Sequence, residues 1–115
     1  MVIALFAPEV SAATWVNVGT TNNGSVYDVD WDSLGRNGNL VTFTLRVQYS
    51  SAAAQSGADG FIALRQANCA DRSFTDLHTD YMLKGKVLNS TSADDSQRAR
   101  PSTIGAGVVD KVCSK

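Results

Sequence analysis

The clearest pattern in the chain is an alternation of apolar and polar residues within positions 40–49, strict from residue 41 onward. A period of two is typical of a β-strand with one buried side and one side that faces water. A pairing shift of one residue would exchange the two sides, so the pattern also favours a single register. We therefore predict a long strand here, whose buried side carries Val41, Phe43, Leu45, Val47 and Tyr49.

Shorter apolar patterns predict further strands on either side of this one. Asn23 and Gly24 form a turn-prone pair between two such segments, which indicates a β-hairpin. Phe74 lies out of phase with the rest of its segment, which indicates a β-bulge or a late strand start, the in-phase residues being Leu77, Thr79, Tyr81 and Leu83. The predicted strands are residues 14–19, 25–29, 40–49, 60–69, 74–83 and 87–88.

Polar, turn-forming segments separate these strands. Residues 30–34 are predicted to form a tight turn or a short 3₁₀ segment, and residues 36–39 a second turn. Residues 50–59 are predicted to form a loop, within which residues 52–55 can make a helical turn. Residues 89–100 are the most polar segment of the chain and are predicted to form a solvated loop.

A helix is predicted at the C-terminal end, with Ser102 as its N-cap. Four apolar residues then share one face at helical spacing, namely Ile104, Val108, Val109 and Val112. Gly105 and Gly107 weaken this helix by roughly 1 kcal/mol each relative to alanine, so it needs tertiary support. The whole pattern predicts an α+β fold, an antiparallel sheet of about six strands with the C-terminal helix packed on one face.

The first residues of the chain indicate export. An apolar run at residues 2–7 is followed by small residues up to Ala12 and Ala13, as at the end of a secretory signal. No basic segment precedes the run, so the signal would be truncated, and an ordinary N-terminal strand is the alternative. We assign residues 1–13 to a signal remnant and residues 14–115 to one folded domain, a length typical of single domains.

Two cysteines are present, Cys69 at the end of a predicted strand and Cys113 near the end of the predicted helix. If the chain is exported, they meet an oxidising compartment and are expected to form a disulfide. Closing a loop of about 44 residues contributes on the order of 4 kcal/mol in the chain-entropy model. That is a large share of the stability of a domain of this size.

The charge of the chain argues against several kinds of partner. Ten basic and eleven acidic residues give a net charge of -1, so no strongly basic surface for nucleic acid is indicated. No apolar stretch is long enough to cross a bilayer as a helix. We therefore expect neither a nucleic-acid partner nor a membrane span.

Two groups of residues contain side chains of the kinds found in chemical sites. Asp28, Asp30 and Asp32 resemble the start of a calcium loop, but Ser33 and Asn39 stand where such a loop needs glycine and a bidentate glutamate. These aspartates are better understood as residues that cap backbone amides at a turn.

The second group is catalytic in type. Cys69, His78 and the nearby acidic residues could supply a nucleophile, a base and an orienting group, the acidic residues being Asp71, Asp76 and Asp80. No nucleophile elbow or glycine-rich turn accompanies them, and Cys69 has a disulfide partner at hand. We expect no enzyme activity, no metal and no cofactor.

Two pairs of basic residues are the candidate partner-binding positions. Lys84 and Lys86 flank a glycine, and Arg98 and Arg100 lie in the polar segment. They could meet an acidic partner such as a sulfated polysaccharide, although solvated turns are the simpler interpretation. Trp15, Tyr27 and Trp31 are predicted to lie in the core or at its rim, and any of them that is exposed would be a natural contact.

The order of several short motifs resembles the surface-adhesin protein E family. Residues 14–19 and 26–34, followed by Gly38, are similar to the opening of that family: a tryptophan, a glycine, a segment with tyrosine and aspartate that ends in serine and leucine, and a glycine turn. The long alternating strand, the strand that ends at Cys69 and a terminal helix with Cys113 also fit. Asn68 and Trp31 depart from the usual aspartate and proline.

This resemblance implies a small antiparallel sheet whose terminal helix is pinned by the disulfide, in a protein exported by a Gram-negative bacterium. The namesake binds host extracellular-matrix components and can dimerise, so the resemblance implies an adhesin-like binding module that can form homodimers. We expect a periplasmic, cell-surface or secreted protein. The alternative is a periplasmic accessory or assembly subunit without an adhesive role.

Overall fold

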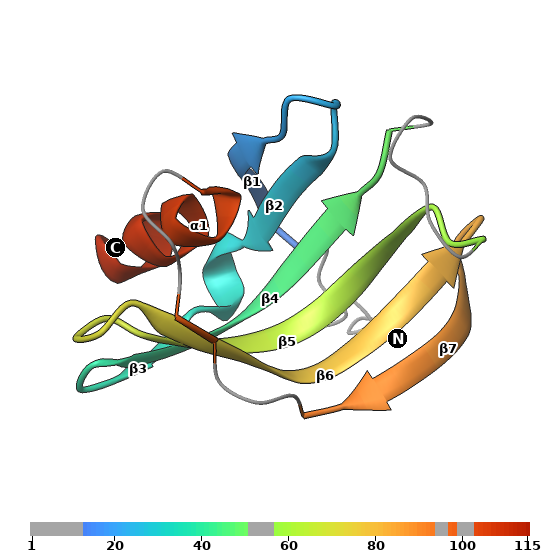
Figure 1. Ribbon diagram of the computed structural model, residues 1–115. Helices are drawn as coiled ribbons and strands as arrows, with labels where there is room; N and C mark the ends of the chain where they lie inside the picture. Colours follow the sequence, from blue (N-terminus) through green and yellow to red (C-terminus); the bar gives the residue numbers. More distant parts are fainter. Residues whose placement is uncertain (1–12, 51–56, 94–96, 99–102) are drawn as a thin grey trace, which may run out of the picture.

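The fold is built around β4 (Leu40–Gln48), the strand that the alternating pattern predicts. The structure, a computed structural model, describes residues 13–50, 57–93, 97–98 and 103–115. Its elements are shown in Figure 1 and occur in the order β1 (Trp15–Thr20), β2 (Val26–Asp30), η2 (Trp31–Ser33), β3 (Gly35–Asn37), β4, β5 (Gly60–Asn68), β6 (Ser73–Leu83), β7 (Lys86–Ser92), β8 (Gln97–Arg98) and α1 (Ile104–Cys113).

All of these strands form one antiparallel sheet in the order β1-β2-β4-β5-β6-β7. Two short strands, β3 and β8, each pair with one end of a longer strand, on a side where another strand pairs with its other end. β3 pairs with the first residues of β4, on the same side of β4 as β2, and η2 joins the two. β8 pairs with the first residues of β6, on the same side as β7. The predicted α+β architecture, with six main strands and one terminal helix, is confirmed.

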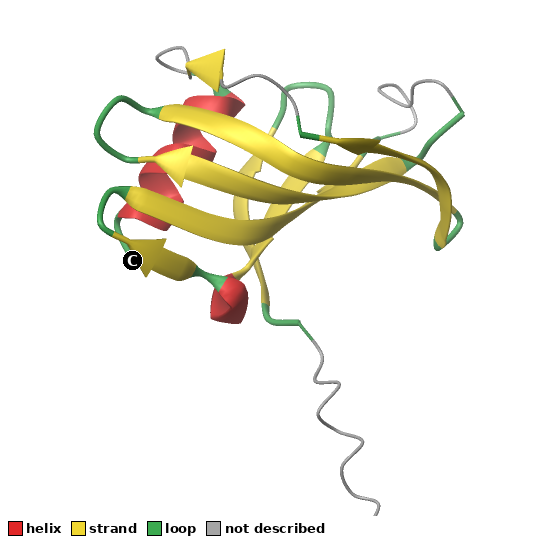
Figure 2. Cartoon of the chain, turned by 90° about the horizontal axis from the view of Figure 1, so that it is seen from below, coloured by secondary structure: helices red, strands yellow, loops and turns green. Residues whose placement is uncertain are grey.

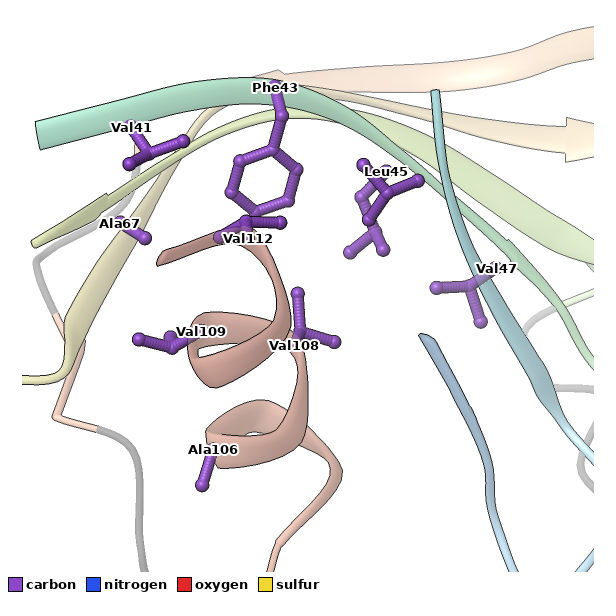
Figure 3. Close-up of a cluster of buried hydrophobic side chains, with 10 residues drawn as sticks. Val41, Phe43, Leu45, Val47, Ala67, Ala106, Val108, Val109 and Val112 are labelled. Atoms are coloured by element: carbon purple, nitrogen blue, oxygen red, sulfur yellow. The ribbon is translucent and has the colours of Figure 1, made fainter. Parts of the chain in front are cut away.

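The helix α1 lies on the concave side of the curved sheet, at one end of it (Figure 1, Figure 2). The apolar side of β4 is fully buried, and Figure 3 shows its side chains facing those of the helix. The sheet contributes Val29, Val41, Phe43, Leu45, Val47 and Ala67 to this core, and the helix contributes Ala106, Val108, Val109 and Val112. The apolar side of the strand and the apolar face of the helix, both predicted from the sequence, therefore pack against each other. The fold is a structure of two layers, a sheet and a helix.

Both ends of α1 are fastened. The Thr103 hydroxyl accepts a hydrogen bond from the Ala106 amide and caps the first turn. Ser102, the residue predicted for this role, lies outside the described residues; the cap is one position later. At the other end a disulfide joins Cys113 to Cys69, with the Cα atoms 5.8 Å apart, as predicted. Arg36 also donates to the Cys113 carbonyl oxygen over 3.0 Å.

A β-bulge in β6 changes which side chains face the helix. Leu64 pairs with His78 but Arg65 pairs with Asp76, so Leu77 is an extra residue in β6. The bulge inferred from the phase of Phe74 is confirmed. Because of it, Asp76 lies opposite Arg65 on the inner side of the sheet rather than in water.

Asp76 and Arg65 form a buried bidentate ion pair there. The Arg65 Nε and Nη2 atoms donate to the two Asp76 carboxylate oxygens over 2.6 and 3.1 Å. Their side chains are only 7% and 14% exposed, and the guanidinium also lies 4.2 Å from the centre of the Phe74 ring. Neither charge can be removed alone without leaving the other uncompensated in a dry environment.

Three expectations about the polar segments are corrected by the structure. Residues 89–92, predicted to begin a solvated loop, extend β7 well beyond the two residues expected for it. β8 lies within the same predicted loop. β3 lies where only a turn was predicted. The 3₁₀ segment after β2 is confirmed as η2. The helical turn proposed for residues 52–55 lies outside the described residues.

The disulfide should carry a large part of the stability of the fold. We expect the Cys69→Ala/Cys113→Ala variant to lose about 4 kcal/mol of unfolding free energy, because the unfolded chain is no longer closed into a loop. Urea unfolding followed by circular dichroism measures this. Wild-type protein treated with a reductant should show the same loss. A midpoint that is unchanged in both samples would contradict the role assigned to the bond.

The buried ion pair predicts a contrast between two aspartates. Asp76→Asn should cost about 3 kcal/mol, since it leaves the Arg65 charge buried without a counter-ion. Asp110→Asn removes the partner of Arg72 in an ion pair whose side chains are 41% and 63% exposed, and should cost less than about 1 kcal/mol. Urea midpoints of the two variants, measured side by side, test this; equal losses would show that burial does not govern the pair.

Candidate functional site

The hairpin between β6 and β7 lies at the end of the sheet away from the helix (Figure 1), and all residues of β7 are exposed. Leu83 pairs with Lys86, so the turn consists of Lys84 and Gly85, whose φ angles are 51° and 80°. Two positive φ angles suit the tight turn that best matches the twist of antiparallel strands. The Lys84 amide donates to the Asp59 carboxylate over 2.9 Å, which fixes the turn to the segment before β5.

Apolar and cationic side chains lie together on this hairpin. Val87 and Leu88 are 55% and 47% exposed, and they are two of the four large apolar residues that are exposed in the described part of the chain. Five residues line a shallow hollow of about 410 Å³ at the hairpin, and we call them the hairpin surface: Leu83, Lys84, Lys86, Val87 and Leu88. Adjacent apolar residues that stay exposed in this way typically mark a contact site.

A second hollow of about 400 Å³ adjoins the hairpin at the same end of the sheet. Its lining includes Tyr49, Gly60, Phe61 and Met82. The Tyr49 and Phe61 rings meet edge to face with their centres 6.2 Å apart, and Tyr81 continues the row at 5.9 Å from Phe61. Burial, and then the neighbouring tyrosines, raise the pKa of the Tyr49 hydroxyl above its ordinary value.

The candidate cations occupy different parts of the molecule. Lys84 and Lys86 are exposed neighbours on the hairpin. Arg98 belongs to β8 and pairs with Ser73, at the end of β6 opposite to the hairpin. Arg98 and the two hairpin lysines are therefore about 33 Å apart, measured along β6. Arg100 lies outside the described residues. The structure therefore unites only Lys84 and Lys86, and partner binding at any of the four positions stays a prediction.

Folding also brings together basic residues that are far apart in the sequence. Lys111 and Lys115 lie beside Trp31, with their amines 6.0 and 5.1 Å from its ring centre, and Arg36 reaches the end of the same helix at Cys113. Two of these cations are already used as donors: Lys115 donates to the Trp31 carbonyl oxygen and Arg36 to that of Cys113. The cluster complements the negative end of α1 and holds the helix to η2. Its contacts are structural.

The residues weighed as a catalytic group have structural roles in the fold. Cys69 is in the disulfide, so the thiol that catalysis would need is not free. His78 and Ser90 both hydrogen-bond to Asp80, whereas a triad would require the histidine in the middle. These hydrogen bonds, first that of Ser90, lower the pKa of the Asp80 carboxyl.

The three aspartates weighed as a calcium loop act as acceptors of hydrogen bonds within the chain. Asp28 pairs with Arg46 over 2.9 Å, Asp30 accepts from the Thr14 amide, and Asp32 accepts from the Thr14 hydroxyl. In the part of the chain that the structure describes, no three acidic, histidine or cysteine side chains are grouped as a metal site. Nor do the described residues include a helix long and apolar enough to cross a membrane.

Two of the three aromatic residues predicted for the core or its rim, Tyr27 and Trp31, are found there, whereas Trp15 is not part of the core cluster or of the residues packed against it. Tyr27 and Trp31 are partly buried against the core cluster. Trp15 is partly buried beneath Arg46, whose guanidinium lies 4.1 Å from its ring centre. Burial, the largest influence, raises the pKa of Tyr27, while Arg65 acts in the opposite direction. None of the three contributes to the hairpin surface, so the exposed contacts come from aliphatic residues that the sequence did not single out.

Comparison with protein families places this geometry in context. The family model for surface-adhesin protein E matches residues 15–114, nearly the whole chain, and the chain belongs to this family. Neither the curated proteins nor the solved structures contain a significant match. As a member of this family, the chain is an adhesin-like surface protein that is exported or exposed at the cell surface. The match agrees with the resemblance seen in the motifs.

Gly60 should be irreplaceable at the edge of the second hollow. A Cβ atom added there would lie 2.2 Å from the Val47 carbonyl oxygen, a backbone atom that cannot move alone. We expect Gly60→Ala to cost about 2 kcal/mol more than Gly35→Ala, whose Cβ would meet nothing within 4 Å. Thermal and urea unfolding of both variants measure the difference; equal stabilities would mean that β4 and β5 separate at little cost.

Proposed function

We propose that this member of the surface-adhesin protein E family is an exported binding module of the bacterial cell envelope that attaches to host extracellular-matrix proteins. The observation that carries the proposal is the hairpin surface, where exposed Val87 and Leu88 lie beside Lys84 and Lys86. Such a mixture suits a protein partner with apolar and acidic groups, since apolar contacts supply affinity and charges steer the approach.

The rest of the molecule supports a binding role by its rigidity. The disulfide and the buried core fix the helix to one end of the sheet, and Asp59 fixes the hairpin turn at the other. A preformed surface loses little conformational freedom when a partner binds. Of the residues considered as a catalytic group, Cys69 is in the disulfide, Asp76 is in the ion pair with Arg65, and His78 is hydrogen-bonded to Asp80. Binding at the exposed hairpin surface therefore accounts for the features of this protein without an enzymatic activity.

We further propose that residues 1–13 are the remnant of a secretory signal and that residues 14–115 are the functional domain. An oxidising compartment is the one in which the disulfide forms and persists. The periplasm and the outer surface both meet that condition. An accessory subunit of the cell envelope is the second candidate, because the fully exposed strand β7 could equally pair with an envelope protein. Access of external protease to the protein on intact cells separates the two.

Binding to matrix should depend on the hairpin charge. We expect purified wild-type protein to be retained on an immobilised basement-membrane extract and Lys86→Glu to bind about tenfold more weakly, because attraction to acidic groups becomes repulsion. Lys111→Glu, the same change at an exposed lysine at the end of the helix, is the control and should bind like the wild type.

Surface plasmon resonance at two salt concentrations measures these affinities. Higher salt should weaken the wild type more than Lys86→Glu. Absence of retention of the wild-type protein would refute the matrix-binding function. Equal loss in both lysine variants would show that overall charge, and not the hairpin surface, is responsible.

A further inference from the structure

Among the residues that the structure describes, no strand pairs with the outer edge of β7. β7 is the last strand of the sheet and pairs with β6 on one side only, and all seven of its residues are exposed. The opposite edge strand, β1, is protected because α1 packs against it. Edge strands in natural sheets are commonly blocked by proline or by several charges. β7 contains no proline and a single charged residue, Lys86.

An extended peptide is the occupant that fits such an edge. A strand added alongside β7 would satisfy the outward backbone amides and carbonyls with hydrogen bonds of its own. A lipid surface could attract Lys84 and Lys86 and accept Val87 and Leu88. However, hydrocarbon would leave the backbone groups of the edge without partners, at a cost of several kcal/mol for each group. The exposed backbone therefore favours a protein segment over a membrane.

The side chains along β7 specify the chemistry of that segment. The strand begins with a cation, continues with two apolar residues, and ends with small polar residues from Asn89 to Ser92. Leu88 is the extra residue of a second bulge, between the pairs Asn89–Tyr81 and Val87–Met82. A complementary segment carries acidic groups beside Lys84 and Lys86 and apolar groups beside Val87 and Leu88.

A second copy of the chain fits this edge poorly. Two β7 strands paired antiparallel over their full length would place the polar half of each against Val87 and Leu88 of the other. Moving the register to join the apolar residues would shorten the ladder and bring the two pairs of lysines toward each other, with like charges that repel. Charge complementarity thus points to an acidic partner and not to self-association.

We infer that β7 binds an extended segment of a partner protein by antiparallel strand addition, and that this segment runs from polar to apolar to acidic residues. The inference rests on the proposed binding function and names its mode and the class of partner. Antiparallel pairing is chosen because every existing pair in the sheet is antiparallel and because that pairing is the more stable per residue.

A synthetic peptide provides the probe. It begins with four threonine or serine residues, continues with valine and leucine, and ends with two glutamates. Fluorescence anisotropy should show saturable binding to the wild-type protein, a similar affinity for Lys111→Glu, and an affinity for Lys86→Glu that is about tenfold lower. The same peptide with lysines in place of its glutamates should bind at least tenfold more weakly. Circular dichroism shows that the protein variants are folded.

Methylated peptides test the backbone contacts without altering the protein. Methyl groups on alternate peptide nitrogens remove one of the two rows of amide donors. Strand addition predicts that the row facing β7 abolishes binding and that the opposite row leaves it nearly intact. Binding that survives both kinds of methylation would overturn the inference, as would binding only to anionic phosphatidylglycerol vesicles. So would a stable dimer in analytical ultracentrifugation that excludes the peptide.

The matrix experiment separates this inference from the function on which it rests. If saturating peptide displaces wild-type protein from the basement-membrane extract, both are supported. If retention persists in the presence of saturating peptide, the strand-addition mode is overturned while the matrix-binding function stands. Peptide binding by a protein that the extract does not retain would refute the matrix-binding function and support strand addition to a different partner.

Discussion

Attachment of the helix to the sheet is the constraint on which the rest of the structure depends. α1 has ten residues, two of them glycine, and a helix this short is marginal on its own in water. It persists because Val108, Val109 and Val112 are buried against β4 and because Cys113 is bonded to the end of β5. In return it covers the inner side of β4, whose apolar row would otherwise face solvent. The two layers are stable only together.

The bulge at Leu77 places a charged residue on the inner side of the sheet. It turns Asp76 inward against Arg65, so the inner side of the sheet passes from an apolar region to a satisfied ion pair. A neutral residue at either position would leave a buried charge without a partner. The pair thus keeps two charged residues buried on the inner side of the sheet, beside Phe74 and opposite Phe43 of the core.

The sequence predicts the parts of this fold in which local pattern and burial coincide. Residues 40–48 alternate because one side of β4 is dry and the other wet, and the phase of Phe74 indicates the bulge. β7 leaves no such signal, because both its sides are exposed and neither needs apolar residues after Leu88. Lys84 and Lys86 could be singled out as neighbours in the chain. The exposure of Val87 could not, since it depends on which strand ends the sheet.

An open edge favours pairing between copies of a chain, and β7 limits such pairing by few means. One lysine in the strand and another in the turn discourage pairing between copies, and the bulge at Leu88 interrupts a flat ladder. The two lysines and the bulge disfavour pairing with a second, like-charged copy of the chain. They do not disfavour pairing with an acidic segment whose backbone can adapt to the bulge. The features that restrain self-association are therefore the same features that would select a partner, and this joint role explains why an apolar, unpaired edge can persist in a stable fold.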